Sequence, residues 1–296
     1  MLYYIQEGEK MYRNCKLCPR MCGVDRSGGE KGYCGGPDRA LVAKTMVHKW
    51  EEPVLAGNGG SGAIFFGGCT LGCKYCQNRA ISGSAVGQPV DGRGLRQMME
   101  KLIAEGAENI DLVTPTHYLP TVLEALEQPL PVPVVYNCGG YERVESLKLL
   151  EGKVDIYLPD MKYADAPLGR DLSGAADYFP VAAKAIKEMV RQVGRPVFDG
   201  EKLKKGVIVR HLILPGQVEN SLRALDWIGD TFAPGEVLVS LMRQYTPMPA
   251  VAEMPPMDRT VTDEEYDAVL SWMYLNDLEG FTQEDAAAGE GFIPDF

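Results

Sequence analysis

The amino-acid sequence predicts an α/β fold built on an open parallel sheet. From residue 63 onward, short apolar runs alternate with amphipathic helical patterns, which is typical of repeated βα units. Six such units can be recognised, fewer than the eight that close a complete barrel. The sequence therefore predicts an open (β/α)6 partial TIM barrel with one large core.

Short apolar runs are the predicted strands of this barrel. Runs of this length that are rich in Val, Ile and Leu are typical of strands buried on both faces of a parallel sheet. The predicted strands are residues 63–66, 110–113, 132–136, 154–158, 207–214 and 237–242.

Helical periodicity fills the segments between these strands. In the clearest case the apolar residues recur at i, i+3, i+4, i+7 and i+8, and Gly106 follows as a stop signal. Those residues are Leu95, Met98, Met99, Leu102 and Ile103. The other predicted helices cover residues 122–126, 144–150, 182–193 and 222–228.

Composition divides the chain into three predicted parts. Residues 1–60 are rich in Gly and Cys with little periodicity, so we expect a small irregular module held by metal ligands. Residues 61–245 form the barrel. Residues 246–296 begin with a proline-rich loop, continue with a helix opened by a capping box at 262–265, and end in an acidic tail packed on the barrel.

Bulk properties exclude several classes of protein. The chain has 41 Asp and Glu against 30 Lys and Arg, and a net charge of −11 argues against nucleic acid as the main partner. No apolar segment reaches the length of about 18 residues needed to span a membrane, and the first residues lack the pattern of a secretion signal. We therefore expect a cytoplasmic protein whose clustered cysteines bind metal in a reducing compartment.

Three cysteines follow the first predicted strand in a C-x3-C-x2-C pattern: Cys69, Cys73 and Cys76. Neighbouring glycines let such a loop turn tightly and bring backbone N–H groups close to a metal cluster. Three thiolates can hold three irons of a cubane [4Fe-4S] cluster and leave the fourth iron open. A zinc loop is the alternative, although structural zinc sites favour C-x2-C pairs and a fourth ligand.

Four further cysteines form a second group nearer the N-terminus: Cys15, Cys18, Cys22 and Cys34. Four ligands fill the coordination shell of a metal completely, which is typical of a structural site. A Zn²⁺ ion and a second iron–sulfur cluster are both compatible with this spacing.

The Cys69 loop, with an aromatic residue before its last cysteine, resembles the signature of the radical S-adenosylmethionine (SAM) superfamily. The Cys76-Gln77-Asn78 ending and the Asp160-Met161-Lys162 stretch are similar to the activating enzymes of glycyl radical enzymes. Together with the Cys-Pro-Arg segment from Cys18, these motifs cover nearly the whole chain. They resemble the pyruvate formate-lyase activating enzyme-like group, and the resemblance implies the radical SAM type of partial barrel, a [4Fe-4S] cluster and SAM.

The resemblance also implies that SAM lies at the C-terminal ends of the strands, where polar residues follow the apolar runs. The candidate SAM contacts are Asn78, Thr114, Thr116, His117, Asn137, Asp160, Lys162 and Arg210. A turn with a helix cap is the alternative for the residues after Val113, and a surface ion pair is the alternative for Asp160 with Lys162. Cys138 and His211 are expected to be buried packing residues.

The function that the resemblance implies is reductive cleavage of SAM to a 5′-deoxyadenosyl radical, which abstracts hydrogen from a substrate. Such an oxidoreductase needs an electron donor of the flavodoxin or ferredoxin type. The leading substrate is a protein or peptide glycine, as in glycyl radical enzyme activation. Another peptide side chain or a small molecule is the alternative, and a non-catalytic iron–sulfur electron-transfer protein is a second. No catalytic residue is singled out.

Overall fold

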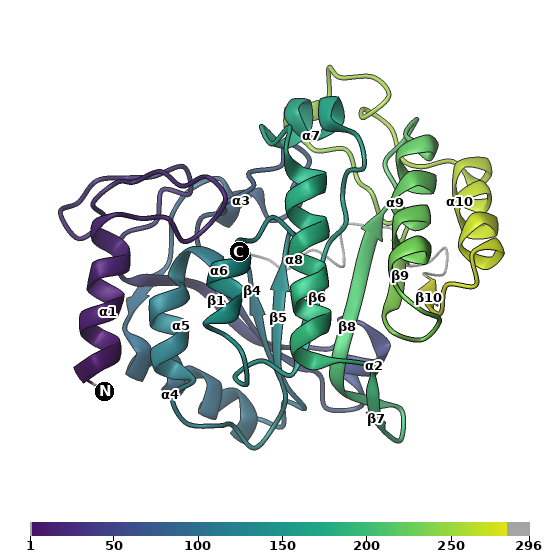
Figure 1. The fold of residues 1–296 in the computed structure, drawn as a ribbon. Coiled ribbons are helices and arrows are strands. Elements are labelled where there is room, and N and C mark those ends of the chain that lie inside the picture. The colour runs from purple at the N-terminus through teal and green to yellow at the C-terminus, as the bar shows by residue number, and fades with distance from the viewer. Residues whose placement is uncertain (1, 283–296) are drawn as a thin grey trace.

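A parallel sheet forms the centre of the computed structural model, which describes residues 2–282 (Figure 1). Each parallel strand lies beside its neighbours in sequence, in the order β9-β8-β6-β5-β4-β2. This is the predicted open (β/α)6 arrangement, which is confirmed. The strands are β2 (Ser61–Phe66), β4 (Ile110–Val113), β5 (Val134–Cys138), β6 (Ile156–Pro159), β8 (Lys202–Leu212) and β9 (Leu238–Met242).

Helices cover the outer face of the sheet and bury their apolar sides on it (Figure 1). In α4 the side chain of Asp91 caps the first turn by accepting from the Gly94 N–H, while Leu95, Met99 and Leu102 are buried. All the predicted helices are present, and the short α3 (Arg79–Ser82) and α7 (Ala166–Ser173) are additional. The predicted ones are α4 (Gly92–Ala104), α5 (Leu119–Ala125), α6 (Val144–Lys148), α8 (Tyr178–Val193) and α9 (Val218–Thr231).

The N-terminal part contains more regular structure than its composition predicts. The expectation of an irregular module is wrong for α1 (Leu2–Arg13) and for β1 (Ala40–His48), which pairs antiparallel with β2. The short β3 (Gln88–Val90) pairs with β1 in turn. Because β1 is near the edge of the sheet and mostly half-buried, its residues show no clean alternation of apolar and polar types.

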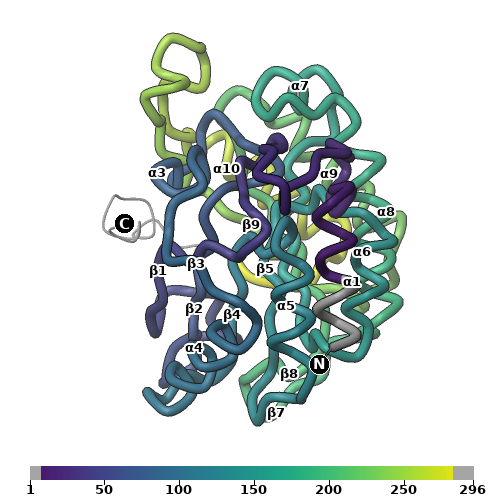
Figure 2. The backbone as a smooth tube through the Cα atoms, turned by 90° about the vertical axis from the view of Figure 1, so that its left-hand side faces the viewer, coloured from purple at the N-terminus to yellow at the C-terminus, as the bar shows by residue number. Residues whose placement is uncertain are grey.

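Residues 14–39 join α1 to β1 without helix or strand, as the composition predicts. Figure 2 shows α1 alongside α5, with the segment that follows it in the upper part of the molecule, below α7. This position brings the N-terminal cysteines to the end of the barrel where the parallel strands terminate.

The C-terminal part adds a helix and a strand to the barrel. The predicted capping box is confirmed, because Thr262 and Glu265 each bond the other's backbone N–H at the start of α10 (Asp263–Leu275). The proline-rich loop contains the short 3-10 helix η2 (Pro249–Val251), and β10 (Gly280–Thr282) pairs parallel with β9. Residues 283–296 of the predicted tail lie outside the described residues.

A separate cluster of apolar residues on the inner face of the sheet forms the floor of the barrel. Leu55 of α2 (Pro53–Ala56) packs there against inward residues of the strands, such as Val135, Ile156 and Ile208. This floor lies toward the N-terminal ends of the strands, so the opposite end is left for polar side chains. Within the described residues, no helix combines the length and apolar character that crossing a membrane requires.

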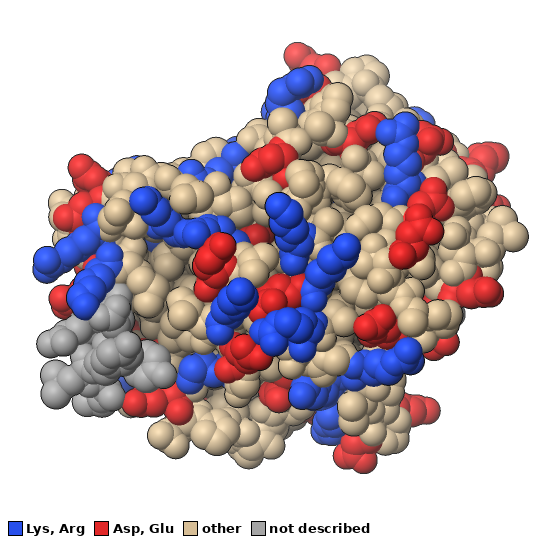
Figure 3. All heavy atoms as spheres, viewed as in Figure 1, with Lys and Arg blue, Asp and Glu red and all other residues tan. Residues whose placement is uncertain are grey.

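Charged residues of both signs are interspersed on the molecular face drawn in Figure 3. Exposed ion pairs join neighbouring elements, such as Arg191 with Glu151 and Arg223 with Asp165. Exposed pairs of this kind contribute little to stability. Other charged residues are buried inside the barrel, among them Asp160 and Asp111.

Candidate active site

The loop after β2 is shaped by glycines that cannot be replaced without a clash. A Cβ on Gly67 would collide with the carbonyl of Val86. Gly68 has a φ of +85°, and a Cβ there would lie 2.5 Å from the carbonyl oxygen of Cys34. The close approach of these backbones therefore fixes the start of the C-x3-C-x2-C loop.

Each sulfur of this loop accepts a hydrogen bond. Donors of this kind stabilise thiolates and tune the clusters that thiolates hold, so the donor set fits an anionic iron–sulfur cluster. They are the Leu71 N–H at 3.4 Å from Cys69 Sγ, the Ser173 hydroxyl at 3.1 Å from Cys73 Sγ and the Ser82 hydroxyl at 3.2 Å from Cys76 Sγ.

A cavity of about 200 Å³ lies beside this loop at the C-terminal ends of the parallel strands. Its wall includes the cluster loop, the segments after β6 and β9, and β8. Gln77 of the loop donates to the carbonyl of Gln244 at 3.1 Å, so the segments that follow β2 and β9 are linked in the cavity wall. The predicted site residues in the wall are Cys73, Cys76, Asn78, Asp160, Lys162 and Arg210.

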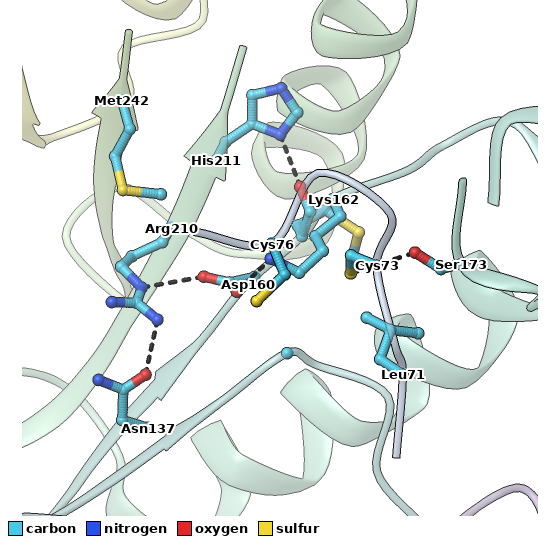
Figure 4. Close-up of polar contacts among 12 residues, drawn as sticks. Leu71, Cys73, Cys76, Asn137, Asp160, Lys162, Ser173, Arg210, His211 and Met242 are labelled. Carbon is cyan, nitrogen blue, oxygen red and sulfur yellow. Dashed lines mark hydrogen bonds and ion pairs between the residues drawn. The ribbon is translucent and has the colours of Figure 1, made fainter. Parts of the chain in front are cut away.

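Asp160 joins the two cations of this cavity (Figure 4). One carboxylate oxygen accepts from Arg210 Nε at 2.9 Å, and the other lies 2.6 Å from Lys162 Nζ. Burial acts to raise the pKa of Asp160, but Arg210 and Lys162 outweigh it and lower that pKa below its usual value. The Asp160 and Lys162 side chains are only 10% and 15% exposed, so this is not the surface ion pair that the sequence allowed as an alternative.

Arg210 is held in place by the protein itself. It donates to Asn137 Oδ1 at 2.6 Å and lies 3.8 Å from Glu51. Asn137 in turn donates to Asp111 at 3.2 Å. Asn137 therefore contributes to the site through Arg210, and the buried charge that the sequence singled out in β8 has protein carboxylates as partners.

Three acidic residues near Arg210 belong to the surroundings of the site and were not predicted from the sequence. Glu51 and Glu52 come from the segment between β1 and α2, and Asp111 comes from β4. Burial, with Glu51 nearby, raises the pKa of Glu52 to about 7, and burial also raises the pKa of Asp111. One charged residue inside an apolar strand was the signal for Arg210, and the same signal was present at Asp111.

Four predicted SAM contacts do not line the cavity: Asn137, which accepts from Arg210, and three residues after β4. Thr114 donates its N–H to the Asn137 carbonyl at 2.8 Å. Thr116 and His117 belong to the 3-10 helix η1 (Thr116–Tyr118), which turns their side chains away. The Thr116 hydroxyl donates to Glu142 at 2.6 Å, and His117 Nε2 lies 2.8 Å from the Gly67 carbonyl. Contact between these residues and SAM stays a prediction.

The expected packing residues are fully enclosed. His211 Nδ1 lies 2.6 Å from the Met161 carbonyl, and because a carbonyl only accepts, Nδ1 carries the proton and Nε2 accepts from Ser221. The prediction of a satisfied core histidine is confirmed. Cys138 is buried, which raises its pKa well above the usual range and keeps the thiol protonated.

The N-terminal cysteines lie close to the cluster loop. The Tyr33 hydroxyl donates to the Leu71 carbonyl at 3.2 Å, and Cys34 abuts Gly68. Across the part of the chain that the structure describes, no three His, Cys, Asp or Glu side chains converge closely enough to hold a single metal ion. Metal binding by these four residues therefore stays a prediction.

Comparison with known proteins finds one family model that matches part of the chain and one relative over most of it. Residues 55–125 match the model of a 4Fe-4S single cluster domain. An uncharacterized protein of Methanocaldococcus jannaschii is 29% identical over 276 residues, which is 90% of this chain and 76% of that protein.

Solved structures share the barrel at low sequence identity. A radical SAM methyltransferase from Sphaerobacter thermophilus matches with a TM-score of 0.52 and 13% identity, covering 77% of this chain and 69% of that one. Streptococcus suis SuiB bound to its precursor peptide SuiA matches with a TM-score of 0.49 and 11% identity over 73% of this chain, but only 46% of the SuiB chain is covered. The chain therefore shares its fold with a radical SAM methyltransferase, and its residues 55–125 match a 4Fe-4S single cluster domain, as the resemblance drawn from the Cys69 loop implied.

Proposed function

We propose that this protein is a radical SAM enzyme that uses a [4Fe-4S] cluster in the Cys69 loop to cleave SAM. The observation that carries the proposal is that two of the loop's cysteines share one cavity with Asp160, Lys162 and Arg210. Ligands of parallel βα barrels bind at this end of the strands. An electron-transfer protein does not need buried charged groups beside its cluster.

Different residues at this site would bind the cluster and SAM. Cys69, Cys73 and Cys76 would hold three irons. When bound, the cluster would supply one electron for the cleavage of SAM into methionine and a 5′-deoxyadenosyl radical, and that radical would take a hydrogen atom from the substrate. The electron comes from a donor of the flavodoxin or ferredoxin type.

Lys162 is the residue best placed to hold the carboxylate of SAM. Its ammonium has three donors, and its one ion pair with Asp160 leaves donor capacity toward the cavity. Asp160, ionised between its two cations, can accept from the amino group or the ribose of SAM. Arg210, already bonded to Asp160 and Asn137, positions Asp160 and adds positive charge.

Cleavage of SAM tests the proposal. Anaerobically reconstituted protein, reduced with dithionite, should form 5′-deoxyadenosine from SAM, measured by chromatography. Cys73→Ala should lose the product together with the cluster absorption. Cys138→Ala is the matched control, because this cysteine is also buried but lies outside the cavity wall. A full cluster without any 5′-deoxyadenosine would favour electron transfer and overturn the proposal.

For the substrate we propose a glycine in a protein or peptide. The support is the likeness of the Cys76-Gln77-Asn78 and Asp160-Met161-Lys162 stretches to activating enzymes. Co-incubation with a glycyl radical enzyme encoded in the same genome, SAM and reductant should give the EPR doublet of a glycyl radical. A genome without such an enzyme, or SAM cleavage without the doublet, would point to another peptide side chain or a small molecule.

A further inference from the structure

Two of the N-terminal sulfurs accept hydrogen bonds, as the sulfurs of the cluster loop do, and such donors stabilise a thiolate that holds a metal. The guanidinium of Arg26 donates to Cys15 Sγ at 3.7 Å. Cys22 accepts from the Tyr33 N–H at 3.4 Å, which ties the second half of the segment to the first.

Arg20, between Cys18 and Cys22, connects this segment to the cluster loop. Its guanidinium donates to the carbonyls of Thr70 and Leu71 at 2.9 and 3.2 Å. It also donates to the carbonyls of Ser173 and Gly174, at 2.8 and 2.5 Å, while it stacks on Tyr33 with 3.8 Å to the ring centroid. One side chain thus binds the backbone on both sides of the cluster site.

The bonds of Arg20 bear directly on the cluster ligands. Thr70 and Leu71 lie between Cys69 and Cys73, and Ser173 donates its hydroxyl to Cys73 Sγ (Figure 4). A guanidinium has a fixed fork of donors, so it holds these carbonyls at set positions relative to one another. The conformation of residues 15–34 therefore determines how the ligands of the Cys69 loop are presented.

We propose that Cys15, Cys18, Cys22 and Cys34 bind a second metal centre, and that this centre positions Arg20 against the cluster loop. The ligand chemistry is a soft metal closed by four thiolates, supplied by one zinc ion or by an iron–sulfur cluster. Residues 14–39 form no helix or strand, and a metal bound by the four cysteines would cross-link this segment in addition to the bonds of Arg20. The proposal depends on a cluster in the Cys69 loop but not on SAM cleavage.

Metal analysis tests the second centre. The anaerobically prepared protein should contain either about one zinc beside four irons, or clearly more than four irons per chain, and these two results distinguish the sources. Cys18→Ser should lose this additional metal, whereas Cys138→Ser, outside both groups, should keep it. Four irons without zinc in the wild type, or full metal content in Cys18→Ser, would overturn the proposal.

Arg20 tests the positioning role without touching a ligand. Arg20→Ala should keep the additional metal, yet lose the irons of the Cys69 cluster to a chelator about tenfold faster and show a changed EPR spectrum of the reduced cluster. Arg20→Lys should restore part of the effect, and Arg39→Ala, an exposed arginine, is the control. Chelation rates and EPR spectra equal to those of Arg39→Ala would refute the role of Arg20, whatever the SAM assay gives.

Discussion

Asp160 determines the charge balance of the cavity. Sequence reasoning found it, together with Lys162 and Arg210, because polar residues that follow parallel strands meet at one end of a barrel. It did not find Glu51, because contact between that residue and Arg210 depends on how β1 packs beside β2. Nor did it show that η1 turns the Thr116 hydroxyl toward Glu142, because a run of residues after a strand does not reveal that turn.

Replacing Asp160 by Asn should weaken SAM binding without loss of the cluster. The change keeps the side chain's size but removes its negative charge and one of the two oxygens that accept from Lys162 and Arg210. Loss of one buried, charged hydrogen bond corresponds to about tenfold to a hundredfold in affinity, measured by equilibrium binding of SAM. Asp171→Asn, in an exposed ion pair, is the control. Equal affinity in both variants would place SAM elsewhere.

His211 should make the protein less stable in acid. Burial lowers its pKa from 6.5 to about 4, so the folded state binds this proton less readily than the unfolded chain. Its contribution is complete above pH 6.5 and is lost as the pH falls toward 4. Denaturant unfolding at several pH values should show a smaller loss over this range in His211→Asn than in the wild type. Parallel profiles for the two proteins would contradict this assignment.

Helices and strands could be predicted from the sequence where a whole face of the element is buried. The six parallel strands and the helix α4 have periodic apolar residues because each buries a full face. Strand ends were displaced, as in β5, which begins at Val134 after Pro133. The strand β1 was missed because its side chains are half-buried, so tertiary pairing with β2 decides its conformation.

The turn after β2 should tolerate no side chain at Gly68. Gly68 and Gly152 both have positive φ, at +85° and +76°, so alanine strains the backbone at either position. Only Gly68 also faces a neighbour, the carbonyl of Cys34, whereas a Cβ at Gly152 meets nothing within 4 Å. Gly68→Ala should therefore have the lower thermal midpoint and the lower iron content after reconstitution. Equal losses in both variants would mean that the contact with Cys34 is unimportant.

Across the whole molecule, the N-terminal segment is attached by contacts that local sequence patterns cannot reveal. Arg26 is buried and donates to the carbonyl of His117 at 2.6 Å and to that of Pro37. It also stacks over the ring of Tyr12, at 4.5 Å from the centroid. Periodicity predicts the elements but not which distant backbone groups a single guanidinium will join.

Removal of this guanidinium should loosen the N-terminal segment and leave the barrel folded. Arg26→Met keeps much of the apolar stem but leaves the two carbonyls without their donor. Limited proteolysis, followed by mass spectrometry, should then cut within residues 14–39 while residues 61–245 resist. Arg13→Met, at an exposed position, should behave like the wild type. Cleavage spread over the barrel would show that Arg26 stabilises the entire fold.

The hydrogen bonds of Arg20 join residues that the ribosome synthesises at very different times. Arg20 and Gly174 are 154 positions apart, and the sulfur ligands of the Cys69 loop lie between them. A ribosome therefore exposes every cysteine of the loop well before Ser173 and Gly174 emerge to fix its backbone. The backbone carbonyls that accept from Arg20 are all present only after more than half of the chain has been translated. A cluster inserted before that moment would enter a loop that lacks the Ser173 hydrogen bond, so the finished geometry belongs to late stages of synthesis.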